Sequence, residues 1–119
     1  MALARAAGTS LRRRYETITP SGLADLMASS DSVTIVDVRL PSDFESGHIE
    51  GAINIPYIDF DAHAADVPRG PTVVAVCYLG MLSRTAAQRM VADGHVRVLN
   101  LDRGMAGWRD HAAHLDNAG

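Results

Sequence analysis

The residue best suited to do chemistry in this chain is its single cysteine, Cys77, which ends the apolar run "TVVAVC" at residues 72–77. Residues 78–82 ("YLGML") follow, and the pattern "SRTAAQRM" from Ser83 onward is typical of a helix. A thiol at this place can act as a nucleophile if it reaches a substrate as the thiolate. It can equally be a small buried apolar side chain, which is the commoner case for one cysteine after a strand.

The short segment between Cys77 and the helix favours the nucleophile. An arc over the start of a helix directs successive backbone N–H groups inward, which makes a site for an anion and favours a thiolate there. Gly80 supplies the backbone freedom that such an arc needs, and Ser83 is a good N-cap for the helix. The spacing by itself leaves both interpretations open. The candidate site is Cys77 as catalytic residue, with substrate-binding residues Tyr78, Leu79, Gly80, Met81, Leu82 and Ser83.

The elements that must position this site alternate between strand-like and helix-like segments. Strands are expected at 15–19, 33–38, 52–56, 72–77 and 96–101, and helices after Thr19-Pro20 and at 41–46, 58–66, 83–93 and 105–113. The runs 33–38 and 72–77 are apolar on both faces, as in strands buried inside a parallel sheet. The sequence therefore predicts an α/β fold with a mainly parallel central sheet flanked by helices on both faces. Cys77 would lie at the carboxyl end of a strand, where such sheets usually bind ligands.

The composition is that of one soluble globular domain: 119 residues, 47% hydrophobic and 21% charged. We expect an N-terminal extension at 1–14, the domain at 15–113 and a C-terminal tail at 114–119. The extension contains four arginines and no acid, which is typical of an organelle-targeting leader or of a plain extension; its shortness favours the latter. The net charge of -3 gives no reason to expect a nucleic-acid partner, and no apolar stretch is long enough to span a membrane.

A single cysteine cannot form an internal disulfide, so a reducing, cytoplasmic location is expected. No metal site is expected, because the other candidate ligands show no metal-ligand spacing with Cys77; these are His63, His95, His111 and His114.

Four motifs in order resemble those of the rhodanese-like domain. They are "DVR" at 37–39, "GHIEGAINIP" at 47–56, "CYLGMLS" at 77–83 and "GMAGW" at 104–108. Each motif alone is weak, but their order gives a resemblance over about residues 16–112. It implies the rhodanese-like fold.

The resemblance also implies an enzyme, a sulfurtransferase of the thiosulfate sulfurtransferase (rhodanese) type. In this family the loop cysteine, here Cys77, takes a sulfane sulfur from thiosulfate or another persulfide donor and becomes a persulfide. The persulfide then passes that sulfur to cyanide, a thiol or a protein acceptor. No metal or organic cofactor is implied.

The loop departs from the family pattern in its charge. Many active members carry an arginine or lysine inside the loop, whereas residues 78–82 contain no cation and Arg84 follows just after them as a supporting candidate. Leu79, Met81 and Leu82 give the site an apolar rim instead. We therefore expect modest thiosulfate turnover with a high KM, and a protein persulfide or an apolar thiol as donor or acceptor.

Asp37 and Arg39 are further supporting candidates because they follow a predicted strand near the site. Asp37 could accept hydrogen bonds from the cysteine loop, or it could form an ion pair with Arg39; both interpretations stay open. Arg39 could also pair with Glu45 across the helical turn. His48 is expected to be a hydrogen-bonded turn residue rather than a catalytic base.

Two other functions compete with sulfur transfer. The first is a non-enzymatic binding or redox-sensing module of the same fold, favoured by the missing loop cation. The second is a phosphatase or arsenate reductase, since some of these enzymes share the fold with a loop longer by one residue. Their signature arginine comes one position earlier than Arg84, where this chain has Ser83. The spacing therefore does not place an arginine where these enzymes use one to bind the phosphoryl group.

Overall fold

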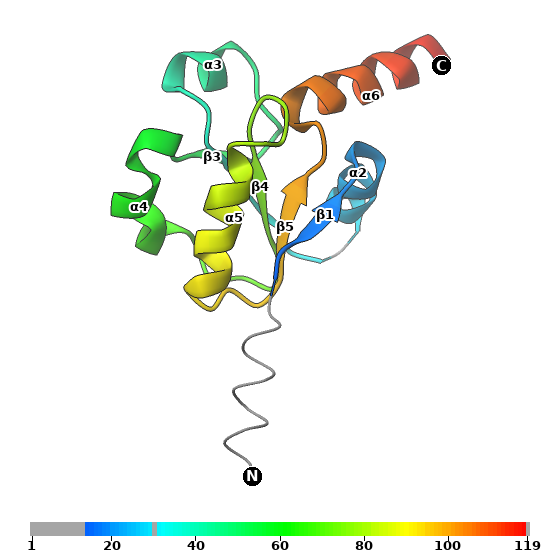
Figure 1. The fold of residues 1–119 in the computed structure, drawn as a ribbon. Coiled ribbons are helices and arrows are strands. Elements are labelled where there is room, and N and C mark those ends of the chain that lie inside the picture. Colours follow the sequence, from blue (N-terminus) through cyan, green and yellow to red (C-terminus); the bar gives the residue numbers. More distant parts are fainter. Residues whose placement is uncertain (1–13, 30, 119) are drawn as a thin grey trace.

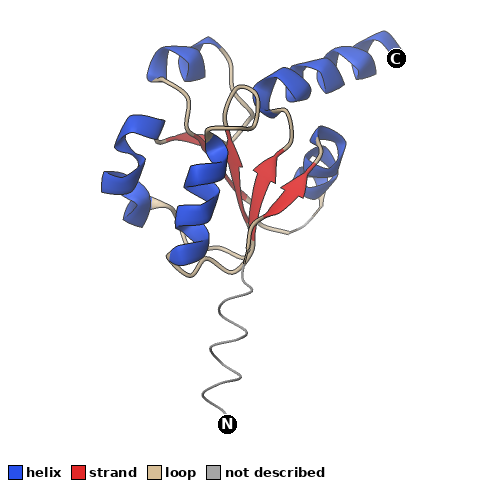
Figure 2. Cartoon of the chain, viewed as in Figure 1, coloured by secondary structure: helices blue, strands red, loops and turns tan. Residues whose placement is uncertain are grey.

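The computed structural model describes residues 14–29 and 31–118, which form a five-stranded parallel sheet with helices on both faces (Figures 1 and 2). The strand order is β1-β5-β4-β2-β3, and every neighbouring pair is parallel. The strands are β1 Glu16–Ile18, β2 Thr34–Asp37, β3 Ile53–Asn54, β4 Val73–Val76 and β5 Val98–Leu101. The predicted fold class is therefore confirmed, and β4, which leads to Cys77, is the central strand.

Alternate residues along the central strands build two separate cores. Ala75 faces a core that includes Phe60 of α4 and Met90 of α5, whereas the adjacent Val74 faces a core that includes Leu23 of α2. Side chains of a strand alternate between faces, so an apolar strand needs helices on both sides. The helices are α2 Pro20–Ala28, α3 Pro41–Ser46, α4 Phe60–His63, α5 Ser83–Ala92 and α6 Gly104–Ala118. Within the described residues, no helix is both long and apolar enough to cross a bilayer.

Local start and stop signals act as the sequence predicts. The Thr19 hydroxyl accepts a hydrogen bond from the Gly22 amide at 3.0 Å, and Pro20 is the first residue of α2. Pro41 begins α3, and Gly94, with a φ of 87°, follows the end of α5.

Two helix predictions need correction. The segment 58–66 is not one helix but a 3₁₀ turn η1 (Tyr57–Asp59), the short α4 and a second turn η2 (Ala64–Asp66). Only Phe60 and Ala64 in this segment are buried, so too little apolar surface holds a continuous helix against the sheet. The last helix extends past the predicted 113 to Ala118, because no glycine or proline after Gly107 interrupts it before that residue. The predicted extension, except for residue 14, lies outside the described residues.

His95, in the turn after α5, makes the stability of the fold depend on pH. Its side chain is buried, and burial lowers its pKa from the ordinary value of 6.5, with Arg69 adding to the shift. The folded protein therefore binds this proton less tightly than the unfolded chain does. We expect the free energy of unfolding to be highest above pH 6.5 and to fall as the pH decreases from 6.5 through the lowered pKa.

Because one proton is involved, the free energy of unfolding can change by at most about 1.4 kcal/mol per pH unit from this residue. Urea unfolding at a series of pH values, from neutral pH down to the acidic pH at which carboxylates begin to titrate, measures this pH dependence. A His95→Gln variant should show a flatter profile; an unchanged slope in that variant would assign the effect to other groups.

Candidate active site

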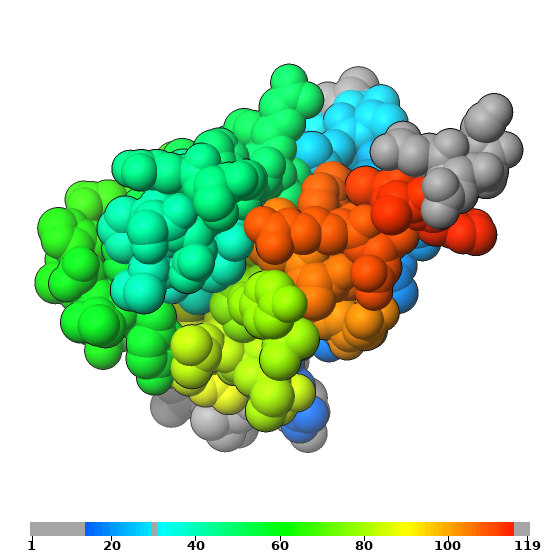
Figure 3. All heavy atoms as spheres, turned by 90° about the horizontal axis from the view of Figure 1, so that it is seen from above, coloured from blue at the N-terminus to red at the C-terminus, as the bar shows by residue number. Residues whose placement is uncertain are grey.

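Cys77 directly follows β4 and lies at the floor of a pocket of about 660 Å³ at the carboxyl end of the sheet. Its side chain is only 3% exposed. Seen from above, α3, the loop after β4 and the first turns of α6 meet at this end of the molecule (Figure 3). The other lining residues are Val38, Arg39, Leu40, Asp43, Ser46, Tyr57, Ile58, Tyr78, Leu82 and Arg109. The sulfur can thus be reached only by a substrate that enters this pocket.

Two hydrogen-bond donors of the predicted loop face the sulfur. The Gly80 amide donates to Cys77 Sγ at 3.1 Å, and the Ser83 hydroxyl lies 3.2 Å from the same atom. Gly80 has a φ of 89°, and a Cβ atom at this residue would lie 3.0 Å from the Leu101 carbonyl oxygen. The positive φ and the close backbone therefore require glycine here. An N–H group directed at Sγ can stabilise negative charge that a reaction places on the sulfur.

The amides of the other loop residues have no hydrogen-bond acceptor in the described part of the chain; they belong to Tyr78, Leu79, Met81 and Leu82. Buried amides need a partner, but this loop is at the surface and its amides can bind an incoming anion. Of the six predicted substrate-binding residues, Tyr78 and Leu82 line the pocket, and Gly80 and Ser83 lie within hydrogen-bond distance of the sulfur.

The prediction that Ser83 caps α5 is wrong. Leu82 precedes the helix as its N-cap, and Ser83 is the first helical residue with a fully buried side chain. Its hydroxyl lies 2.6 Å from Asn100 Oδ1, so it is held toward the sheet rather than toward the first helical amides. A buried hydroxyl needs a partner, and the adjacent strand supplies one.

Asn100 is a site residue that the sequence reasoning missed. It lies on β5, beside β4, and its side chain is buried. Its Nδ2 donates to the Gly80 carbonyl at 3.0 Å, and its Oδ1 accepts a hydrogen bond from the Ser83 hydroxyl. It therefore ties the middle of the loop, at Gly80, and the residue after it, Ser83, to the sheet. The available signal was an asparagine inside an apolar strand, where this residue type is disfavoured unless its amide has partners.

Ser83→Ala should weaken both the fold and the reactivity of Cys77. The change leaves Asn100 Oδ1 buried without a donor, which costs about 1–3 kcal/mol, and removes the polar group 3.2 Å from Sγ. Urea unfolding measures the first effect, and the rate of Cys77 alkylation by iodoacetamide measures the second. Thr85→Ala, at an exposed position on the same helix, is the matched control. Equal behaviour of the two variants would contradict the assigned hydrogen bonds.

The start of α6 holds the cysteine loop from the other side. The amides of Met105 and Ala106 donate to the carbonyls of Cys77 and Tyr78 at 2.8 and 3.0 Å. Gly104 begins this helix with a φ of 49°, and its Cα approaches the backbone of Cys77 and Tyr78 closely. The first glycine of the "GMAGW" motif therefore serves the geometry of the site.

The structure decides between the two interpretations of Asp37. Its buried carboxylate forms an ion pair with Arg39 at 2.9 Å and does not bind the cysteine loop. The predicted pair of Arg39 with Glu45 is wrong, since Glu45 is exposed and Arg39 Nη2 instead donates to Asp37 and to the Gly47 carbonyl at 2.8 Å. The pair fixes the pocket wall between β2 and α3.

Two more candidates, Arg84 and His48, are not among the residues that line the pocket. Arg84 is exposed on α5. The His48 ring stacks on Phe44, and its Nδ1 bonds the Phe44 carbonyl at 2.7 Å, which confirms a turn residue.

Exposed apolar side chains surround the pocket. They come from the loop after β4, from the residue before α3 and from η1, so separate segments form one apolar rim. The rim consists of five residues that line the pocket, Leu40, Tyr57, Ile58, Tyr78 and Leu82, and of the exposed Leu79 and Met81, which adjoin Tyr78 and Leu82 in the loop. The apolar rim predicted from Leu79, Met81 and Leu82 is therefore exposed and wider than those three residues.

Known proteins share this sequence and this fold. Residues 19–111 match the family model of the rhodanese-like domain. The chain is 34% identical to the thiosulfate sulfurtransferase GlpE of Shewanella oneidensis, over 71% of this chain and 83% of the relative. It is 30% identical to a protein of Allochromatium vinosum named sulfurtransferase, over 79% and 88% of the two chains.

A crystal structure of a rhodanese-like domain protein from Staphylococcus aureus superposes with a TM-score of 0.71 at 27% identity. The superposition covers 78% of this chain and 90% of the Staphylococcus aureus chain. Residues 19–111, which match the family model, include Cys77, its loop and the first turns of α6. By sequence and by fold, this chain belongs to the rhodanese-like domain family.

Proposed function

We propose that this protein is a sulfurtransferase that carries a sulfane sulfur on Cys77 as a persulfide. The observation that supports this most directly is the sulfur at the pocket floor, with the Gly80 amide and the Ser83 hydroxyl 3.1 and 3.2 Å away. The names of the two bacterial relatives, both sulfurtransferases, agree with it.

The sulfur would be transferred in two steps, first to Cys77 and then to the acceptor. In the first, the Cys77 thiolate attacks the outer sulfur of thiosulfate; a new S–S bond forms, the S–S bond of thiosulfate breaks, and sulfite leaves with the bonding electron pair. In the second, cyanide or a thiolate attacks the outer persulfide sulfur, and the electron pair returns to Cys77. Loop amides would stabilise the anionic donor and the persulfide.

The apolar rim and the loop without a cation bear on the substrate. An apolar thiol or a protein persulfide gains from contact with the rim, whereas thiosulfate finds no charged partner in residues 78–82. We therefore expect a high KM for thiosulfate. We assign the protein to the cytoplasm, where its one thiol would stay reduced.

Mass spectrometry of the intact protein after incubation with thiosulfate tests the proposal. The chain has one cysteine, so a gain of one sulfur atom reports on Cys77 alone. Cyanide should then remove this sulfur as thiocyanate. If thiosulfate and inorganic polysulfide both leave the mass unchanged, the enzyme interpretation fails and a binding or redox-sensing module takes its place.

Hydrolysis of an aryl phosphate is not expected. The position at which the phosphatase signature has its arginine holds Ser83, which is buried and bonded to Asn100. No guanidinium can clamp a phosphoryl group from that position.

A further inference from the structure

The pocket contains a cation that does not come from the loop. Two arginines, Arg39 and Arg109, are among the lining residues, and they differ in their partners. Arg39 is buried, and its guanidinium is neutralised by Asp37. Arg109 is exposed on α6, and its guanidinium forms no ion pair or hydrogen bond with the described residues. The positive charge of Arg109 is therefore free to meet a ligand.

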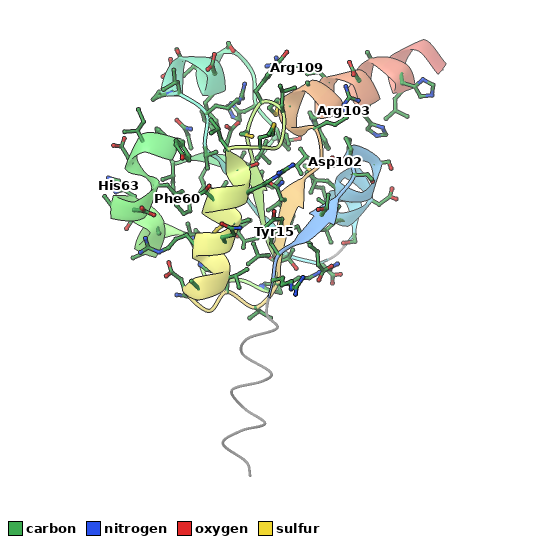
Figure 4. All side chains as sticks on the ribbon, in the orientation of Figure 1. Tyr15, Phe60, His63, Asp102, Arg103 and Arg109 are labelled. Atoms are coloured by element: carbon green, nitrogen blue, oxygen red, sulfur yellow. The ribbon has the colours of Figure 1, made fainter. Side chains whose placement is uncertain are left out.

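Arg109 reaches from α6 toward the opposite wall of the pocket. A Cβ atom built on Gly47, at the end of α3, would lie 3.7 Å from Nη2 of Arg109. The side chain thus approaches α3 from α6 at the end of the molecule that carries the cysteine loop (Figure 4). Arg103, in the turn just before α6, is different, because it pairs with Asp110 at 3.0 Å and does not line the pocket.

One acid faces the same pocket and opposes this charge. Asp43, in the first turn of α3, is exposed and lines the pocket with Arg109. Its carboxylate has no cationic partner within the described residues. An anion that enters the pocket is therefore attracted by Arg109 and repelled by Asp43, and the two residues set its affinity in opposite directions.

We infer that Arg109 binds the anionic end of the sulfur donor and so supplies, from α6, the cation that the cysteine loop lacks. The inference rests on the proposed sulfur transfer for the identity of the donor. With thiosulfate, the guanidinium would hold the sulfonate oxygens while the outer sulfur points to Cys77, and it would stabilise the departing sulfite. Asp43 would limit the affinity for a doubly charged donor.

The charge of the pocket can be measured without sulfur transfer. Iodoacetate and iodoacetamide alkylate the same thiolate, but only iodoacetate is an anion; Cys77 is the one thiol in the chain. We expect Arg109→Ala to lower the ratio of the iodoacetate rate to the iodoacetamide rate by about five- to tenfold, with Arg109→Lys restoring most of it. Asp43→Asn should raise the ratio, and Arg103→Ala should leave it unchanged. Added salt should reduce these differences.

Steady-state kinetics with thiosulfate then tests the donor itself. Arg109→Ala should raise the KM for thiosulfate by about five- to tenfold, and Asp43→Asn should lower it. An alkylation ratio that is the same in wild type and Arg109→Ala overturns the inference, as does an unchanged KM. If wild type shows the alkylation difference but gains sulfur from neither thiosulfate nor inorganic polysulfide, the proposed function fails while the anion site stands.

Discussion

Cys77→Ser should abolish persulfide formation and reduce thiocyanate production by at least about a thousandfold. A serine hydroxyl cannot form the S–S bond that carries the transferred sulfur, and the chain has no second cysteine to replace it. Intact-protein mass after thiosulfate treatment and the colorimetric assay of thiocyanate measure the two effects.

The same variant should remain folded. Oxygen is smaller than sulfur, but it can accept the hydrogen bond from the Gly80 amide, and the serine hydroxyl can donate to the Ser83 oxygen. Circular dichroism and urea unfolding check this point. Undiminished sulfur transfer by a folded Cys77→Ser protein would show that the reaction does not pass through this residue.

Gly104→Ala should be the most damaging single change outside the cysteine. A Cβ at this position would overlap the Cys77 carbonyl oxygen and come within 2.7 Å of two backbone atoms of Tyr78. The loop must then move away from α6, and the hydrogen bonds from Met105 and Ala106 to Cys77 and Tyr78 must stretch. We expect a loss of about 3–5 kcal/mol in unfolding free energy, from overpacking, weakened hydrogen bonds and the positive φ.

Gly51→Ala separates the steric effect from the conformational one. Gly51 also has a positive φ, of 84°, but a Cβ there would have nothing within 4 Å. Its substitution should cost only about 1–2 kcal/mol and leave sulfur transfer intact. Urea unfolding and thiocyanate formation compare the two variants. Equal losses in both would mean that the contact between α6 and the cysteine loop does not position Cys77.

Two segments that are distant in sequence, β5 and the start of α6, hold the cysteine loop in place. Asn100 of β5 holds the loop through Gly80 and Ser83, and the first amides of α6 hold the carbonyls of Cys77 and Tyr78. A nucleophile fixed in this way needs little rearrangement when a donor arrives. The loop is short, but its geometry is imposed by segments about twenty or more residues away.

Local signals explain why much of the fold could be predicted. Apolar runs with β-branched residues marked β2 and β4 as buried parallel strands, and the Thr19-Pro20 pair marked the start of α2. These signals act between residues close in sequence. The prediction failed at 58–66, where the apolar pattern was weak: only Phe60 and Ala64 are buried, too little to hold one continuous helix, and the segment divides into η1, the short α4 and η2.

The sequence by itself determined the order of the strands and helices, the catalytic candidate Cys77, and the need for glycine at 80. Only the tertiary structure decided that Ser83 turns toward Asn100, that Asp37 neutralises Arg39, and that Arg109 lines the pocket of Cys77. The physical reason is that propensity and turn geometry act along the chain. Hydrogen-bond partners and charge balance, in contrast, depend on which side chains the packed sheet and helices bring together.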